Sequence, residues 1–421
     1  MYVKGGDMSS PWFLDLKIIC TTRTPTRTLL DIWPPFPIII TWIPKHSDPK
    51  DEKDQDNIIT VLECHERISQ ISLGYLPYHI FGRFIPLIQE PLPALTHPCL
   101  SSSPFASAMG PVHVLPETFL GGSAPHLQSL TLSGIAFPTL PTLLLSANDL
   151  VHLDLPNSMF TSPEAMVTSL GALANLRELF IKIKPGPALP GPTNHLPSSR
   201  TVLPTLTLFD LRGVSKGVDD LVARIDPPLL DTLHIRLRSG TDPSIVISQL
   251  NQLIIRAERL WPLNQARLEL ECLTTRISLG SQIALCLGCD PCQQLSSTAQ
   301  LCNRLSPLLS HVEQLAIRSA HLAELWRRGI RSTLRVLDLN LFRPFISVQR
   351  LYVCKELVTP FAVALQNLTQ DGAVGVLPGL HSLSLEGPYP SMSPQETMEQ
   401  FLAFRQNSNY PVSLDPWKRD R

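Results

Sequence analysis

The sequence has few charged residues and almost no net charge, and both facts exclude classes of protein. Its 35 lysines and arginines nearly balance 36 aspartates and glutamates, and charged residues make up only 17% of the 421 positions. The chain therefore lacks the basic excess that attracts nucleic acid in general. Hydrophobic residues, at 43%, are enough for a large core, which excludes a disordered polyelectrolyte.

Cysteines and long apolar runs are also scarce. Nine cysteines in 421 residues are too few for a disulfide-stabilised scaffold. The most apolar short run, residues 36–43, is interrupted by Pro37, whereas a membrane-spanning helix needs about 20 apolar residues. The N-terminus leads into no apolar segment with a cleavage site. We therefore expect no membrane contact, a cytoplasmic or nuclear location and reduced thiols.

Catalytic signatures are missing as well. The sequence contains no G-x-S-x-G, no phosphate-binding Walker loop, no H-E-x-x-H and no G-x-G-x-x-G. Asp210 and His234 fall at equivalent positions of neighbouring repeats, but no serine or cysteine is placed beside them as a nucleophile. We therefore expect a protein that is not an enzyme and that has no cofactor.

A repeated six-residue frame, apolar-x-x-apolar-x-apolar, organises the chain. The first positions of neighbouring copies between residues 127 and 230 are separated by 23 to 30 residues, close to the roughly 20–29 of leucine-rich repeats. The ten copies are Ile68/Ile71/Leu73, Leu127/Leu130/Leu132, Leu150/Leu153/Leu155, Leu176/Leu179/Ile181, Leu206/Phe209/Leu211, Leu230/Leu233/Ile235, Val312/Leu315/Ile317, Leu334/Leu337/Leu339, Val348/Leu351/Val353 and Leu380/Leu383/Leu385.

The frame predicts a fold. Its fourth and sixth positions lie on one face of a strand, which cannot bury that face alone, so neighbouring repeats must stack. Helical periodicity occurs in segments that would return the chain between strands, such as 56–67, 77–89, 162–170, 245–257 and 359–365. The prediction is an α/β fold: a leucine-rich repeat (RNI-like) solenoid with a curved parallel sheet, helices on the convex side and irregular repeats.

The repeats are irregular in several places. The asparagine that usually occupies the ninth position is absent, and weaker copies occur at Leu95/Pro98/Leu100 and Leu263/Ala266/Leu268. We predict a solenoid over residues 56–387, with a flexible proline-rich loop at 185–204. Short alternating stretches predict an antiparallel insertion at 264–292. Residues 388–421 are expected to form a C-terminal cap.

The frame also predicts which side chains face the concave side, because its fifth and seventh positions point away from the core. Aromatic residues and arginine often contribute most to binding energy. The alternative is an ordinary solvated sheet face whose charges neutralise one another. The candidate residues for binding a protein partner are Phe180, Lys182, Asp210, Arg212, His234, Arg236 and Tyr352.

Four cysteines are clustered in the sequence. Cys286, Cys289 and Cys292 have the C-x₂-C-x₂-C spacing of part of an iron–sulfur site, and Cys302 could supply a fourth thiolate. Cysteine also serves as a small buried apolar residue. A metal-binding or redox protein is therefore an alternative function, and burial of these thiols is the competing interpretation.

Longer stretches of sequence resemble a known family, the F-box and leucine-rich repeat proteins of mushroom-forming (basidiomycete) fungi. The similarity covers nearly the whole chain from about residue 14. The stretches are IICTTRTPTRTLLDIWPP at 18–35, DNII at 56–59, ISQISL at 68–73, FLGGSAPHLQSL at 119–130, LVARIDPPLLD at 221–231 and QLSSTAQLC at 294–302.

The resemblance implies an adaptor of a cullin-type ubiquitin ligase, in which an N-terminal F-box docks the ligase and the repeats hold the protein substrate. Residues 1–11 contain no Leu-Pro and no apolar helical run, so the expected F-box is missing from this stretch. Residues 1–55 are interpreted as the remnant of the junction between F-box and repeats. A cullin-linked adaptor is expected as a partner if an F-box lies upstream, and a repeat-only scaffold without a ligase role is the alternative.

Overall fold

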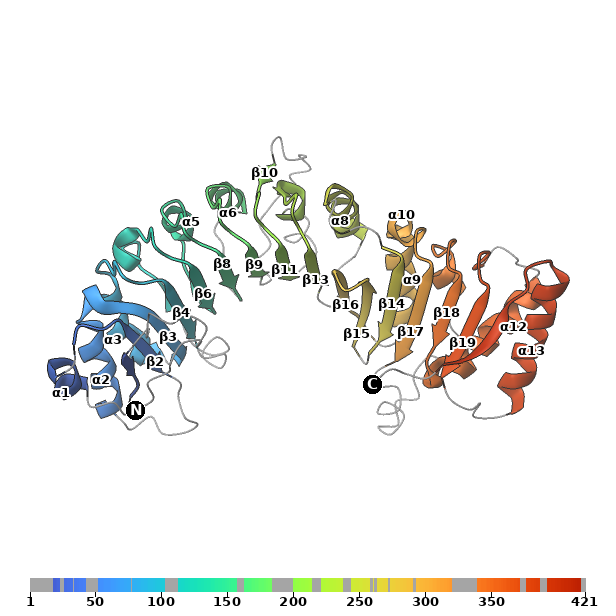
Figure 1. The fold of residues 1–421 in the computed structure, drawn as a ribbon, viewed down its shortest axis with the longest axis horizontal. Coiled ribbons are helices and arrows are strands. Elements are labelled where there is room, and N and C mark those ends of the chain that lie inside the picture. The colour runs from blue at the N-terminus through green and yellow to red at the C-terminus, as the bar shows by residue number, and fades with distance from the viewer. Residues whose placement is uncertain are drawn as a thin grey trace, which may run out of the picture. The chain divides into compact units, whose positions relative to one another are not determined.

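The protein is described here by a computed structural model. It covers residues 18–22, 26–32, 34–42, 52–76, 78–102, 113–156, 163–183, 200–213, 221–237, 244–257, 260, 263–271, 273–290, 293–319, 339–371, 376–386 and 392–417. The chain divides into two compact units, residues 1–209 with 224–228, and residues 210–223 with 229–421. Both units are mixed α/β, with a sheet in which most neighbouring strands are parallel (Figure 1).

The sheet of the first unit follows the order of the chain. Each strand pairs in parallel with the next one. The strands are β1 (Ile18–Cys20), β2 (Ile38–Trp42), β3 (Ile68–Leu76), β4 (His97–Ser102), β6 (Ser129–Ser133), β8 (His152–Leu155) and β9 (Glu178–Lys182). The segment before residue 56 thus contributes two strands, β1 and β2, to this sheet.

Helices and short turns connect these strands. The α-helices are α1 (Thr26–Ile32), α2 (Glu52–Leu62), α3 (Tyr78–Phe84), α5 (Leu140–Leu144) and α6 (Pro163–Leu170), with 3-10 turns η1 (His65–Arg67), η2 (Ile85–Ile88) and η3 (Phe119–Gly122). Two small parallel ladders join β5 (His113–Val114) to β7 (Ile135–Ala136), and β10 (Thr201–Val202) to β12 (Ile225–Asp226). In Figure 1, α5 and α6 lie on the same side of the sheet.

The strands form where the sequence frame occurs, because the frame places its apolar side chains in one buried layer. In every fully described copy the first, fourth and sixth side chains are buried; Leu150, Leu153 and Leu155, for example, are each 0% exposed. The weaker copies behave in the same way, since Leu95, Pro98 and Leu100 are buried in and beside β4. Burying one leucine stabilises the fold by roughly 1.5–3 kcal/mol, so the repeated frame accounts for the core.

Backbone hydrogen bonds hold successive strands in register without an asparagine ladder. The carbonyl at the second frame position accepts two N–H groups from the next repeat: Gln128 O accepts from Val151 N at 2.8 Å and from His152 N at 3.0 Å. The same fork recurs at the carbonyls of Thr96, Val151, Arg177, Asn264, Glu313 and Gln349. These main-chain bonds thus connect successive repeats at the second frame position.

The sheet of the second unit contains an antiparallel interruption. Its order is β13 (Thr232–Leu237), β16 (Ile283–Gly288), β15 (Thr274–Leu279), β14 (Gln265–Leu270), β17 (Gln314–Ser319), β18 (Arg350–Val353), β19 (Ser382–Glu386) and β20 (Ser413–Trp417). β15 is antiparallel to both of its neighbours, and the other pairs are parallel. β11 (Leu208–Gly213) lies where the units divide, with Asp210 onward in the second.

The helices of the second unit bury their apolar faces against this sheet. They are α8 (Ser244–Arg256), α9 (Gln294–Arg304), α10 (Ser306–Leu309), α12 (Val358–Asp371) and α13 (Met392–Asn407), with turns η5 (Leu339–Phe342) and η6 (Lys355–Leu357). Leu253 of α8, Cys302 of α9 and Phe361 of α12 are each 0% exposed. No helix among the described residues is long and apolar enough to span a membrane.

Some sequence predictions fall outside the described residues. These include most of the proline-rich loop, residues 185–199, the first eleven residues, and Cys292. In the frame at Leu334, Leu337 and Leu339, only Leu339 is described, and it begins the 3-10 turn η5 rather than lying in a strand.

Candidate functional site

The structure assigns the seven predicted surface residues to different strands. Phe180 and Lys182 lie on β9 of the first unit, whereas Asp210 and Arg212 on β11, His234 and Arg236 on β13, and Tyr352 on β18 belong to the second unit. In the first unit, the Phe180 ring lies 5.3 Å from that of His152, whose Nδ1 is 2.8 Å from Glu178 Oε2.

The charges at Asp210 and Arg212 are largely neutralised by each other. The Arg212 guanidinium donates two hydrogen bonds to Asp210, from Nε to Oδ1 at 2.8 Å and from the terminal nitrogen to Oδ2 at 2.7 Å. His234 Nδ1 lies 3.8 Å from the same Oδ2. The Asp210 side chain is 8% exposed, so this bidentate pair is partly withdrawn from solvent. Arg212 thus already has a carboxylate partner, and its role in binding a partner protein stays a prediction.

A groove of about 700 Å³ lies on the sheet of the second unit, between His234 on β13 and Tyr352 on β18. Strand register explains the depression. Ala284, Ser278 and Ala316 occupy the row that links His234 to Tyr352, with Arg267 between Ser278 and Ala316. The small side chains of Ala284, Ser278 and Ala316 leave space on the sheet, and the larger side chains of the row surround this space.

Arginines line this groove, and we call it the arginine groove. Arg267, Arg276 and Arg318 line it together with a single carboxylate, Glu269. Glu269 pairs in register with Arg276 on one side and Arg318 on the other. Arg267 lies two residues before Glu269 on the same face of β14, and its terminal nitrogen is 3.9 Å from Glu269 Oε1.

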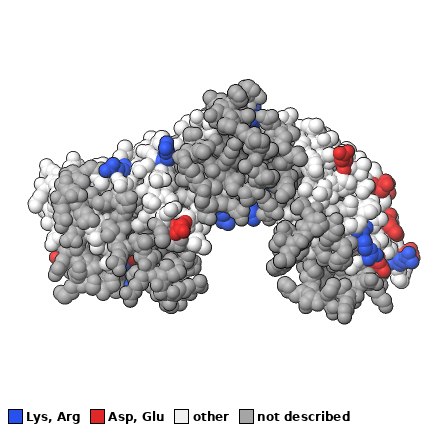
Figure 2. All heavy atoms as spheres, turned by 180° about the vertical axis from the view of Figure 1, so that it is seen from behind, with Lys and Arg blue, Asp and Glu red and all other residues white. Residues whose placement is uncertain are grey.

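The arginine groove therefore has a positive charge that the composition does not reveal. Three arginines against one glutamate leave a balance of +2 when His234 is neutral. Arg236 extends the positive row, because it pairs with Cys286, which in turn pairs with Arg276. Figure 2 shows the described acidic and basic side chains on one face of the molecule, where most of the other described surface is uncharged.

The sequence indicated part of this groove and missed its centre. His234 and Tyr352 were predicted surface residues, and both line it. Arg267 and Arg276 belong to the alternating stretches of the insertion, whose strands could not be placed beside β13 and β17 without knowing their order. Arg318 occupies a seventh frame position, so the frame itself could have identified it.

The clustered cysteines do not converge on a metal site among the described residues. Cys302 is fully buried in α9, and burial raises the pKa of its thiol to about 12. Cys289 lies 3.8 Å from Thr275 Oγ1 and is also buried. Burial raises the pKa of Cys286 too, an effect that Arg236 and Arg276 partly oppose. Cys292 is outside the described residues.

Comparisons with known proteins identify no family for this chain. No family model matches it, and no curated protein is significantly similar to it. Among solved structures, it is similar to a leucine-rich repeat protein of Leptospira interrogans at 13% identity. That match covers 85% of this chain and 98% of the other, with a TM-score of 0.24.

Proposed function

We propose that this protein is a leucine-rich repeat solenoid that binds another protein through the arginine groove. The observation that carries the proposal is the group of Arg267, Arg276 and Arg318 around Glu269 in a hollow of the sheet. Arginine guanidinium groups form charge-assisted hydrogen bonds with carboxylates, so the expected ligand is an acidic segment of the partner.

The dimensions of the groove suit an extended peptide that crosses the strands. From β13 to β18 there are five strand spacings of about 4.8 Å, or roughly 24 Å in all. An extended chain rises about 3.3 Å per residue, so about seven residues would cover this distance. The side chains on the row from His234 to Tyr352 would contact it along its length.

The protein is proposed to act by binding rather than by catalysis, in the cytoplasm or nucleus. A more specific proposal is that it is the substrate-receptor part of an F-box type ubiquitin ligase, which rests on the sequence resemblance alone. Co-purification of a cullin-linked adaptor with the natural full-length product would support that role. Its absence, with substrate binding retained, would favour a repeat-only scaffold.

Charge reversal in the arginine groove tests the binding proposal. The double variant Arg276→Glu with Arg318→Glu changes the local balance from +2 to −2. Because like charges would then face an acidic ligand, we expect binding of a ten-residue glutamate-rich peptide to weaken by about tenfold or more. Fluorescence anisotropy with a labelled peptide measures the affinity.

The control variant is Arg343→Glu, which makes the same change of sign at an exposed position of the second unit outside the groove. It should bind the peptide like the unmodified protein, and both variants should keep its circular dichroism spectrum. Equal affinity of the double variant and the control would exclude the arginine groove as the binding site. Arg212→Glu is unsuitable here, because it would place a second carboxylate against Asp210.

A further inference from the structure

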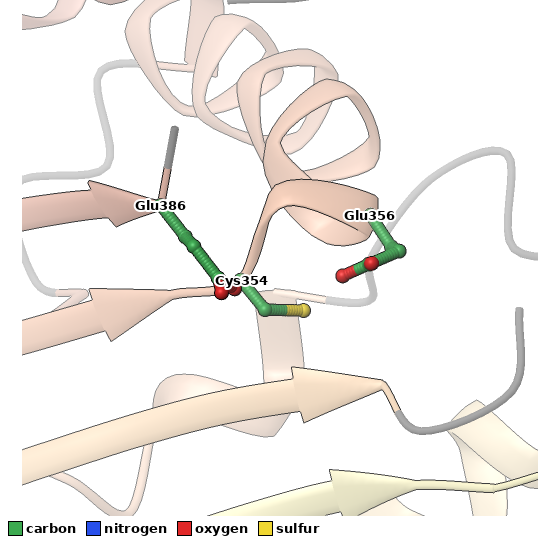
Figure 3. A group of neighbouring side chains, drawn as sticks. All are labelled: Cys354, Glu356 and Glu386. Atoms are coloured by element: carbon green, nitrogen blue, oxygen red, sulfur yellow. The ribbon is translucent and has the colours of Figure 1, made fainter. Parts of the chain in front are cut away.

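Three side chains with metal-binding atoms meet at the ends of β18 and β19, away from the clustered cysteines (Figure 3). They are Cys354, Glu356 and Glu386, and one potential ligand atom from each lies within 4.8 Å of the other two. Among the described residues, no other group of three histidine, cysteine, aspartate or glutamate side chains is as close.

Strand register brings these residues together. Val353 of β18 pairs with Leu385 of β19, so the next residues, Cys354 and Glu386, are neighbours. After Cys354 the chain turns into η6, which brings Glu356 to the same place. The turn is held by main-chain hydrogen bonds: Cys354 N donates to Ile317 O at 3.0 Å, and Leu357 N donates to Cys354 O at 3.0 Å.

The Cys354 thiol accepts one hydrogen bond of the kind that metal-bound cysteines accept. Cys354 is 0% exposed, and its Sγ accepts a hydrogen bond from Ser319 N at 3.2 Å. Backbone N–H groups that donate to sulfur support the thiolate form and adjust the properties of thiolate-bound metals. The main chain of β17 thus supplies one hydrogen bond that would support a thiolate ligand.

The carboxylate of Glu356 provides an independent observation. Its Oε2 atom is buried and meets the hydrogen-bond geometry with no protein atom among the described residues. Burying a carboxylate oxygen without a partner is costly, and a bound ion is one explanation for it. A cation between Glu356 and Glu386 would satisfy this oxygen and would also offset the repulsion between two adjacent carboxylates.

We propose that Cys354, Glu356 and Glu386 bind a divalent cation of the zinc class, with the fourth coordination position open to water. A thiolate with two carboxylates favours zinc over magnesium or calcium, which prefer oxygen ligands alone. Zinc bonds to sulfur at about 2.3 Å and to carboxylate oxygen at about 2.0–2.2 Å, so small side-chain rotations would close the present spacing. The thiol proton leaves to solvent when the metal binds.

Burial, followed by the hydrogen bond and charge of Glu356, raises the pKa of Cys354 to about 12. Because the metal binds the thiolate, the cation must displace the thiol proton, as it does at other cysteine sites. The bound cation would link the end of β18, the end of β19 and the turn η6.

Cobalt provides a direct test, because Co²⁺ bound to a thiolate has a strong near-ultraviolet charge-transfer band. The full chain is treated with chelator, freed of it, and titrated with Co²⁺ and then with Zn²⁺. We expect one equivalent of Co²⁺ to produce the band and Zn²⁺ to abolish it. Absence of the band in the folded, unmodified protein would overturn the proposal.

Variants locate the metal. Cys354→Ser should lose the band, whereas Glu386→Gln should keep a thiol ligand and weaken Co²⁺ binding by about tenfold or more. Glu386→Gln also guards against misfolding, since Glu386 is only half-buried. Cys286→Ser is the matched control and should bind Co²⁺ normally. Loss of the band in Cys286→Ser but not in Cys354→Ser would assign the metal to the other cysteines and refute the site.

Discussion

At the scale of single residues, His113 is a buried titratable group with a predictable effect on stability. It is 2% exposed, its ring lies 4.4 Å from the Phe81 ring, and burial lowers its pKa below the ordinary value of 6.5. The folded state therefore resists a proton that the unfolded chain accepts. Stability from this residue is complete above about pH 6.5 and is lost as pH falls toward the lower folded pKa.

The variant His113→Phe tests this effect, because phenylalanine keeps a ring against Phe81 and cannot titrate. Urea unfolding at pH 7.5 and at pH 5.5 should show a smaller loss of stability on acidification in the variant than in the unmodified protein. His381→Gln, at an exposed site, should leave the pH dependence unchanged. An identical dependence in all three proteins would show that His113 does not bind its proton differently in the two states.

Single residues also show what sequence patterns can and cannot predict. The buried frame positions were predictable, because leucines at this spacing lie on one face of the chain and are buried together. The pairing of Arg212 with Asp210 was not, since either side chain could have turned toward a partner instead. The group of Cys354, Glu356 and Glu386 could have been found from the sequence. Cys354 and Glu386 both occupy the seventh frame position in successive copies, and Glu356 lies two residues after Cys354.

At the scale of elements, the hairpin of β15 and β16 depends on Gly280. Its φ is +57°, a conformation that residues with a side chain adopt at a cost, and its N–H donates to Gln265 O at 2.8 Å. Gly280→Ala should therefore lower the free energy of unfolding by about 1 kcal/mol or more, measured by chemical denaturation. Gly82→Ala is a control with the opposite sign, because Gly82 lies in α3 with open space around it.

Element types were more predictable than element ends. The segment 77–89 was predicted as one helix, but it divides into α3 and η2, because Pro86 cannot continue the helical hydrogen bonds. The predicted helix at 56–67 instead begins at Glu52 and ends at Leu62, and Cys64, with φ −90° and ψ 53°, leaves the helical region. Alternation identified β14, β15 and β16 as strands, yet their order in the sheet could not be deduced from alternation alone.

At the scale of the whole molecule, a net charge of −1 means that long-range attraction of a partner is weak. Binding in the arginine groove should instead depend on a few local charges that salt screens over about 10 Å. We expect the affinity for the acidic peptide to fall steadily between low and high salt, measured by anisotropy. In the charge-reversed double variant salt should instead screen repulsion, so any remaining affinity should rise with salt. Salt-independent binding by the unmodified protein would argue for apolar recognition.

The hairpin of β15 and β16 also affects the direction of the strands that follow it. β13 and β14 run in the same direction, and β14 carries the weak frame Leu263/Ala266/Leu268. In the sheet the two strands of the hairpin, β16 and β15, lie between them. Because the hairpin adds two strands, the chain leaves it in its original direction, and the strands of later repeats keep their orientation. A stack of repeats can therefore gain or lose such a hairpin as one unit. This changes the exposed face of the sheet and leaves the other repeats unchanged.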